Sequence, residues 1–163
     1  NIGNSLVEED KLGVALEIIE KAKSLGVKLL LPIDSINAKE FNNDSDIKLS
    51  DIRNINSNYM GLDIGEQSID LFSKEIKGSK TIIWNGPMGV FEMSNFQNGT
   101  RKIGESIADA TRSGAFSLVG GGDSAAAIKM FNLESKISYL STGGGALLES
   151  LKGEDLPAIK ALI

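Results

Sequence analysis

The residues best suited to chemistry form a run of three glycines, an acid and a hydroxyl at positions 120–124. Apolar residues 116–119 before the run predict a buried strand, and residues 125–130 after it predict a helix. Asp123 and Ser124 are predicted as N-cap residues of that helix. A helix starting there directs free N–H groups and its positive dipole end at the loop, which suits phosphate. Because Asp123 can also hold a divalent cation, the first hypothesis is a magnesium–nucleotide site.

The alternative for this run is an ordinary helix cap on a glycine-rich turn. Three consecutive glycines favour the ligand hypothesis, because they let a ligand approach the backbone closely. The run is not a P-loop, since that motif requires Gly-Lys-Ser/Thr and the chain contains no such tripeptide. It is not the dinucleotide motif G-x-G-x-x-G either, because Asp123 and Ala125 stand where glycines are required.

The composition limits the partners that the chain can have. With 163 residues, 41% of them hydrophobic and 24% charged, the chain is long enough for one domain with a sizeable core. A net charge of −5 argues against a nucleic-acid footprint. No apolar run approaches the ~18 residues of a membrane span. We therefore expect neither a nucleic acid nor a membrane as partner.

The absence of both Cys and His limits the chemistry further. It excludes cysteine nucleophiles, thiolate zinc sites and imidazole bases. A metal would have to be held by oxygen atoms, which favours magnesium or calcium. Phosphoryl transfer suits the remaining side chains, since it needs positioning and charge stabilisation more than an acid–base pair. The lack of cysteine fits a reducing, cytoplasmic location.

Hydrophobic periodicity predicts an alternation of helices and strands. Helical stripes occupy residues 12–22, 66–77, 96–110 and 146–151, and strands are predicted at 27–31, 81–84, 116–119 and 137–140. Residues 33–58, rich in Asn, Asp and Ser, are predicted as a solvated excursion with short extended pieces at 36–41 and 47–49. Residues 59–65 are predicted as a compact apolar turn. This alternation is typical of an α/β protein with an open, mainly parallel sheet.

Three of the predicted strands run into loops that carry polar groups. The loop 85–92 follows one strand, the triglycine run follows the next, and Ser141-Thr142-Gly143-Gly144-Gly145 follows the last. Ligands of open parallel sheets bind beyond the carboxyl ends of the strands. We therefore expect the loops to meet on one rim that carries Asn85, Glu92 and Asp123, with Glu92 free for sugar hydroxyls.

Taken together, the three loops resemble the phosphoglycerate kinase family. The matching motifs are WNGPMGVFE at 84–92, GGGDSAA at 120–126 and STGGGA at 141–146, and the resemblance covers the whole chain. It implies phosphoryl transfer between 1,3-bisphosphoglycerate and magnesium-ADP in glycolysis, in the cytoplasm, by an enzyme that is monomeric at full length. It also implies a Rossmann-like, open, mainly parallel sheet with helices on both faces.

The resemblance further implies a role for each residue of the nucleotide site. Those implied to line the adenine pocket are Met60, Gly61, Leu62 and Val90. Those implied to lie along the ribose and the phosphates are Asn85, Pro87, Glu92, Gly120, Gly121, Gly122 and Ser124, with Glu92 on the ribose hydroxyls. Asp123 is implied to bind the magnesium ion. The residues implied to direct backbone amides at the transferred phosphoryl group are Gly143, Gly144 and Gly145.

Parts of the family pattern have no counterpart in this sequence. The amino-terminal domain, with its basic, histidine-containing site for the phosphoglycerate, is absent. So are the first strands of the nucleotide domain, with a Gly-Gly-Ala-Lys-type loop and the lysines that meet the phosphates. We expect residues 1–163 to be a partial carboxy-terminal nucleotide-binding domain with an incomplete sheet. The strands without counterpart would lie between the predicted strand 27–31 and the other three.

Three consequences follow from that expectation. The chain alone is predicted to be inactive, and to bind 3-phosphoglycerate or 1,3-bisphosphoglycerate only together with the amino-terminal domain. Because an incomplete sheet leaves an edge exposed, the chain is predicted to be marginally stable, to swap elements with another copy or self-associate, or to close the gap by a strand pairing that the family does not have. The alternative function is a non-catalytic module that binds a nucleotide or an anion. A dinucleotide oxidoreductase is disfavoured by the absence of G-x-G-x-x-G.

Overall fold

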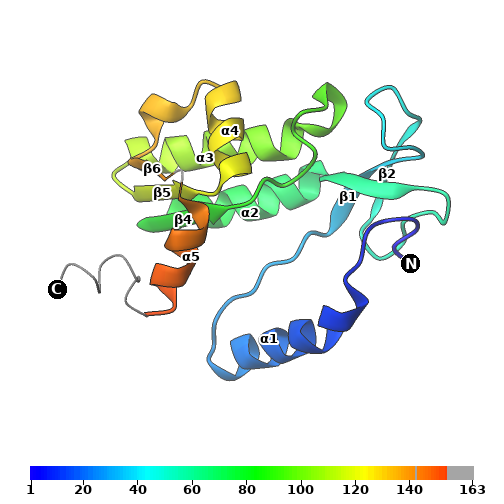
Figure 1. Cartoon of the computed structure of the whole chain (residues 1–163), viewed down its shortest axis with the longest axis horizontal. Helices are drawn as coiled ribbons and strands as arrows, with labels where there is room; N and C mark the ends of the chain where they lie inside the picture. The colour runs from blue at the N-terminus through cyan, green and yellow to red at the C-terminus, as the bar shows by residue number, and fades with distance from the viewer. Residues whose placement is uncertain (142, 154–163) are drawn as a thin grey trace.

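The structure is a computed structural model that describes residues 1–141 and 143–153 (Figure 1). Its elements are η1 (Glu9–Lys11), α1 (Leu12–Ser24), β1 (Asp34–Ala38), β2 (Ile47–Asp51), β3 (Met60–Ile64), α2 (Glu66–Gly78), β4 (Thr81–Asn85), η2 (Ser94–Phe96), α3 (Asn98–Arg112), β5 (Phe116–Gly120), α4 (Gly122–Met130), η3 (Glu134–Lys136), β6 (Tyr139–Ser141) and α5 (Gly144–Leu151). The strands form two open sheets, an antiparallel one in the order β2-β1-β3 and a parallel one in the order β4-β5-β6. The predicted α/β class is confirmed.

The main core lies on one face of the parallel sheet. Along β4 the residues alternate, with Ile82 and Trp84 buried and Ile83 exposed. Ile69 of α2 and Ile107 of α3 pack in the same cluster as the two buried residues. Trp84, the single tryptophan of the chain, is 6% exposed, and its indole N–H has no hydrogen-bond partner among the described residues. Helices α2 and α3 therefore cover this face together.

On the opposite face of the parallel sheet, the described residues provide cover near the carboxyl end of the strands. Gly120 shares this face with Leu118 and Phe116, and the side chain of Leu147 in α5 lies directly over Gly120. Figure 1 shows α5 crossing in front of the strands there. Farther from that end, Phe116 is 51% exposed and Ile83 46% exposed. The prediction of helices on both faces is thus confirmed, with α5 as the described helix on the second face.

The antiparallel sheet corrects two predictions. The solvated excursion predicted at 33–58 holds for most of 39–58, which is exposed, and the extended piece predicted at 47–49 lies in β2, but β1 buries Asp34, Ser35, Asn37 and Ala38. Polar side chains can be buried when they are hydrogen-bonded; the Asn37 amide, for example, donates to the carbonyl oxygens of β1 and β2 and to a β2 hydroxyl. Residues 59–65 are likewise not a turn, since 60–64 form β3, which pairs with β1.

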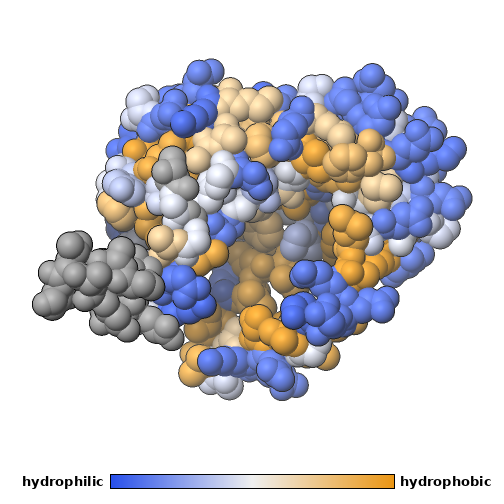
Figure 2. Space-filling model, in the orientation of Figure 1, coloured by the Kyte–Doolittle hydropathy of each residue, from blue (hydrophilic) through white to orange (hydrophobic). Residues whose placement is uncertain are grey.

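The segment from α1 to β1 departs most from the prediction. Helix α1 ends at Ser24 and is followed by Gly26, whose φ of 65° suits glycine, but none of the helix residues is buried. The predicted strand at 27–31 is wrong: no ladder forms there, and Val27, Leu29 and Leu31 are exposed. A strand needs a neighbour for its N–H and C=O groups, and no described strand lies beside this segment. Figure 1 shows α1 and residues 27–31 apart from the parallel sheet. Figure 2 shows a hollow between them that is surrounded by apolar side chains.

Within the two described ranges, no helix is both long and apolar enough to cross a bilayer.

Candidate functional site

The strands of the parallel sheet end in one line. Asn85 of β4 is in register with Gly120 of β5, which is in register with Ser141 of β6. The loops that follow these residues therefore leave the sheet at the same edge. The prediction that the three loops begin at one edge is confirmed.

The triglycine loop enters α4 two residues earlier than predicted. Gly121 is the N-cap and Gly122 the first helical residue, so Asp123 and Ser124 lie in the first turn and neither is the cap. The reason is the backbone at Gly121, whose φ of 96° favours glycine. A Cβ at Gly121 would also lie 2.9 Å from the side-chain oxygen of Asn85. The two loops are thus in close contact at the start of α4.

Asp123 and Ser124 have opposite environments. Ser124 is 1% exposed, and its hydroxyl accepts a hydrogen bond from the Gly86 N–H at 2.7 Å. Asp123 is exposed and makes no side-chain cap hydrogen bond. No three Asp or Glu side chains gather anywhere in the described part of the chain. Asp123 could therefore hold a magnesium ion only as one ligand among several, the others being phosphate oxygens and water.

A second helix begins at the same edge. Gly143 is the N-cap of α5, and its N–H donates to the Ser141 hydroxyl at 3.3 Å. Gly144 and Gly145 form the first turn, and no neighbour lies within reach of a Cβ at Gly145. The amides at a helix start lack intrahelical partners and attract anions. Residue 142, between Ser141 and Gly143, lies outside the described residues.

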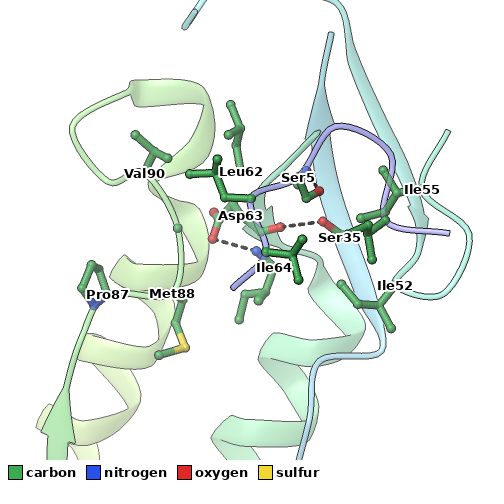
Figure 3. A pocket seen from close by; sticks show the side chains of 15 residues that line it. Ser5, Ser35, Ile52, Ile55, Leu62, Asp63, Ile64, Pro87, Met88 and Val90 are labelled. Carbon is green, nitrogen blue, oxygen red and sulfur yellow. Dashed lines mark hydrogen bonds between the residues drawn. The ribbon is translucent and has the colours of Figure 1, made fainter. Parts of the chain in front are cut away.

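A cavity of about 480 Å³ lies between β3 and the loop that follows β4 (Figure 3). Four of the residues predicted for the nucleotide line it, namely Gly61, Leu62, Pro87 and Val90. Met60 is not part of the lining; it packs instead with Leu62 and Val90 in a small core beside the cavity. The other walls come from the amino-terminal segment and from residues 52 and 55, and they are largely apolar.

Hydrogen bonds hold the two walls of the cavity together. The Val90 N–H donates to the Leu62 carbonyl at 2.9 Å. The Thr100 hydroxyl, in the first turn of α3, accepts from the N–H groups of Met88 and Gly89 at 3.0 and 3.2 Å. The loop is therefore fixed both to β3 and to α3. Its first residues reach the rim and its later residues form the cavity wall.

Sequence reasoning missed Asp63, which lies in β3 at the floor of the cavity and is 5% exposed. Its carboxylate accepts hydrogen bonds from the N–H groups of Ile64 and Gly99, both at 2.8 Å. Burial raises the pKa of Asp63 to about 6, with a smaller contribution from the nearby charge of Glu66, while the two N–H donors act in the opposite direction. An aspartate enclosed by apolar neighbours at 62 and 64 was the available signal.

Glu92 is exposed two residues beyond Val90, and Asn85 is exposed at the end of β4. The structure thus brings the predicted residues into two groups joined by one loop. The rim carries Asn85 and the starts of α4 and α5, and the cavity carries the apolar residues. Glu92 follows the cavity wall on the same loop.

An open parallel sheet with helices on both faces defines an α/β protein of the doubly wound class. Proteins of this class bind ligands beyond the C-terminal ends of the strands, which is where α4, α5 and Asp123 begin the candidate site. Comparison with known families narrows the class. The sequence profile of the family described as "Phosphoglycerate kinase" matches residues 1–154. The chain belongs to the phosphoglycerate kinase family.

Individual relatives agree with this assignment. The chain is 52% identical over 162 residues to a phosphoglycerate kinase of Chloroherpeton thalassium, covering 99% of the chain and 41% of that protein. It is 48% identical over 163 residues to one of Thermosipho africanus, covering 99% and 40%. The solved structure of the Coxiella burnetii phosphoglycerate kinase matches with a TM-score of 0.92 at 43% identity, covering 98% of the chain and 40% of that protein. The chain therefore spans about 40% of the length of these relatives.

Proposed function

We propose that the chain supplies the nucleotide and magnesium contacts of a phosphoglycerate kinase. That enzyme moves a phosphoryl group between 1,3-bisphosphoglycerate and Mg-ADP. The observation that carries the proposal is the shared rim, where the starts of α4 and α5 and the free carboxylate of Asp123 follow β5 and β6. Membership of the family supports it.

The cavity is the proposed adenine site. Gly61, Leu62 and Val90 lie in its lining, where the Val90 N–H is bonded to the Leu62 carbonyl, and Met60 packs with Leu62 and Val90 beside the cavity. An adenine ring is flat and largely apolar, so it suits a mostly apolar cavity with few polar groups. The carboxylate of Glu92, exposed on the adjoining loop, is proposed to accept hydrogen bonds from the ribose hydroxyls.

The rim is the proposed phosphate site. Asn85 on the rim and Pro87 in the cavity lining are proposed to border the ribose and the first phosphate. The backbone of Gly121 and Gly122 allows a close approach, whereas Gly120, also predicted for the phosphates, is covered by Leu147; Ser124 holds the start of α4 beside the Gly86 loop. Asp123 is the proposed magnesium ligand. When bound, magnesium neutralises phosphate charge.

The residues Gly143, Gly144 and Gly145 complete the proposed catalytic edge. They begin α5, so their backbone amides can stabilise the charge that spreads over the transferred phosphoryl group. We propose residues 1–163 as a partial carboxy-terminal nucleotide-binding domain. Binding of 3-phosphoglycerate or 1,3-bisphosphoglycerate is proposed to depend on an amino-terminal domain.

A second candidate is a non-catalytic module that binds a nucleotide or an anion. One observation favours it for this chain alone: the rim and cavity residues described above include no Lys or Arg. Phosphate charge would then be met by backbone amides and a metal ion only.

Calorimetric titration with Mg-ADP, metal-free ADP and NAD tests the proposal. Mg-ADP should bind most tightly, and Asp123→Asn should weaken Mg-ADP much more than metal-free ADP. Asp70→Asn, which changes an exposed aspartate of α2, is the matched control and should change neither. Equal losses with and without the metal would remove Asp123 from the magnesium site. NAD binding as tight as Mg-ADP binding would contradict the proposed ligand class.

A further inference from the structure

Asp63 is a buried carboxylate without a cationic partner. Among the described residues no Lys or Arg forms an ion pair with it; its two partners are the backbone N–H groups of Ile64 and Gly99. A buried, unpaired charge lowers the stability of a fold. Asp63 therefore contributes to this region through the positions in which it holds its neighbours.

The carboxylate connects the two walls of the cavity through a closed series of contacts. Asp63 belongs to β3, and its bond to Gly99 holds the first turn of α3 against that strand. The next residue of α3, Thr100, holds the N–H groups of Met88 and Gly89. The series closes where Val90 donates back to β3 through the Leu62 carbonyl.

The Asp63 carboxylate packs closely against two glycines. A Cβ atom added to Gly89 or to Gly99 would overlap the Asp63 carboxylate. Neither glycine has a left-handed φ, so both positions favour glycine because of close approach. Asp63 therefore touches the loop and the helix directly, as well as through its hydrogen bond. Figure 3 shows it between the two walls.

We propose that Asp63 is a positioning residue of the nucleotide cavity. By clamping the start of α3 to β3, it fixes the position of the loop residues 88–90 against Gly61 and Leu62 of β3. This inference rests on the proposed nucleotide function. It gives Asp63, which does not itself contact the phosphates, a role in shaping the site.

The chain offers a matched control. Asp34, 3% exposed, accepts hydrogen bonds from the N–H groups of Gln67 and Ser68 at 3.0 and 2.9 Å and thereby caps α2 from β1. It is a buried carboxylate with the same kind of partners, but it does not line the cavity. Asp34→Asn should cost stability as Asp63→Asn does, without disturbing the cavity walls.

The first measurement needs no nucleotide. Hydrogen exchange of the unliganded chain should show amides 88–90 exchanging about tenfold faster in Asp63→Asn, the factor expected when one such hydrogen bond is lost. In Asp34→Asn, faster exchange should be confined to the start of α2. Unchanged exchange at 88–90 in Asp63→Asn would overturn the inference. This readout is independent of whether the chain binds ADP.

The second measurement is calorimetry with Mg-ADP and with tripolyphosphate. Asp63→Asn should weaken Mg-ADP about tenfold and leave tripolyphosphate unchanged, since only the cavity wall moves. Asp34→Asn should change neither. Loosened amides with unaltered Mg-ADP affinity would overturn the inference. Failure of the unaltered chain to bind Mg-ADP would instead overturn the proposed function for this chain, while the exchange data still decide whether Asp63 fixes the wall.

A second variant covers the case in which Asp63→Asn does not fold. Thr100→Val keeps the shape of the side chain and removes the acceptor for Met88 and Gly89. Because the clamp reaches the loop through this hydroxyl, Thr100→Val should reproduce faster exchange at 88–90 and weaker Mg-ADP binding. Unchanged values for both would overturn the inference.

Discussion

The Ser124 hydroxyl accepts a hydrogen bond from the Gly86 N–H at 2.7 Å, and so joins the first turn of α4 to the loop that follows β4. The two residues are 38 positions apart in the chain. This bond fixes the triglycine loop and the loop that forms the cavity wall relative to each other. A change at either loop is therefore transmitted to the other.

Replacing Ser124 by Ala should show this coupling. The part-buried Gly86 N–H would lose its acceptor, which costs on the order of 1–3 kcal/mol of unfolding free energy. Mg-ADP affinity should fall as well. Ser106→Ala removes another buried serine hydroxyl, bonded to Ser73 far from the rim, and should cost stability alone. Urea unfolding and calorimetry measure both effects; equal nucleotide affinity in the two variants would contradict the coupling.

Replacing Glu92 by Ala should weaken ADP and GDP alike, by ~1.5–3 kcal/mol, if its carboxylate accepts the ribose hydroxyls. Tripolyphosphate binding should not change, because that ligand has no ribose. Glu134→Ala, which changes an exposed glutamate of η3, is the control and should alter none of the three affinities. A matching loss of tripolyphosphate affinity would show that Glu92 acts on the phosphates.

Asp63 should make stability depend on pH in an unusual direction. Its pKa is about 6 in the fold, against 3.8 as the reference value. Between these values the unfolded chain ionises first, so the contribution of Asp63 to stability grows as the pH falls. From pH 7 to pH 4.5, the unaltered chain should gain about 2 kcal/mol relative to Asp63→Asn. Urea unfolding of both proteins at the two pH values measures the difference; a constant difference would show that Asp63 has an ordinary pKa.

The chain should self-associate as its concentration rises. Leu12, Leu16 and Ile19 of α1 are 54%, 63% and 43% exposed, and Phe116 and Ile83 are exposed on the parallel sheet. Contiguous exposed apolar surface promotes association. Light scattering after size exclusion should show species larger than a monomer, and Leu16→Glu together with Ile83→Lys should shift them toward the monomer. A monomer at every concentration would contradict this.

The chain alone should not convert ATP and 3-phosphoglycerate. Transfer requires the acceptor to be held in line with the donor, and the rim described above holds groups for the donor only. A coupled assay should therefore match the blank without protein. Activity above the blank that disappears in Asp123→Asn would disprove the prediction, and activity that appears only when an amino-terminal domain is added in trans would support it.

The rim could be predicted because each of its parts depends on local sequence. Short apolar runs predict β4 and β5, and a polar or glycine-rich loop marks each carboxyl end, so parallel pairing alone brings Asn85, Gly120 and Ser141 together. The start of α4 was misplaced because the φ of Gly121, set by contact with the β4 loop, decides the cap.

The predictions failed where partners distant in the chain decide the outcome. The apolar residues 27–31 have strand-like composition, but a strand forms only where a neighbouring strand is present. The polar residues of β1 were predicted to be solvated, but they can be buried because Asn37 donates a hydrogen bond to β2 and Asp34 accepts one from α2. Asp63 was missed for the same reason, since its partner Gly99 is 36 positions away.

Because Trp84 is buried, it can serve as an intrinsic fluorescence probe of the fold. An indole that is shielded from water, with its N–H unbonded among the described residues, should emit at short wavelength, and its emission should move to longer wavelength when water reaches it. Because the chain has one tryptophan, the whole signal comes from a residue directly before Asn85 on the rim. Fluorescence can thus follow the opening of the parallel sheet in any of the variants above without an added label.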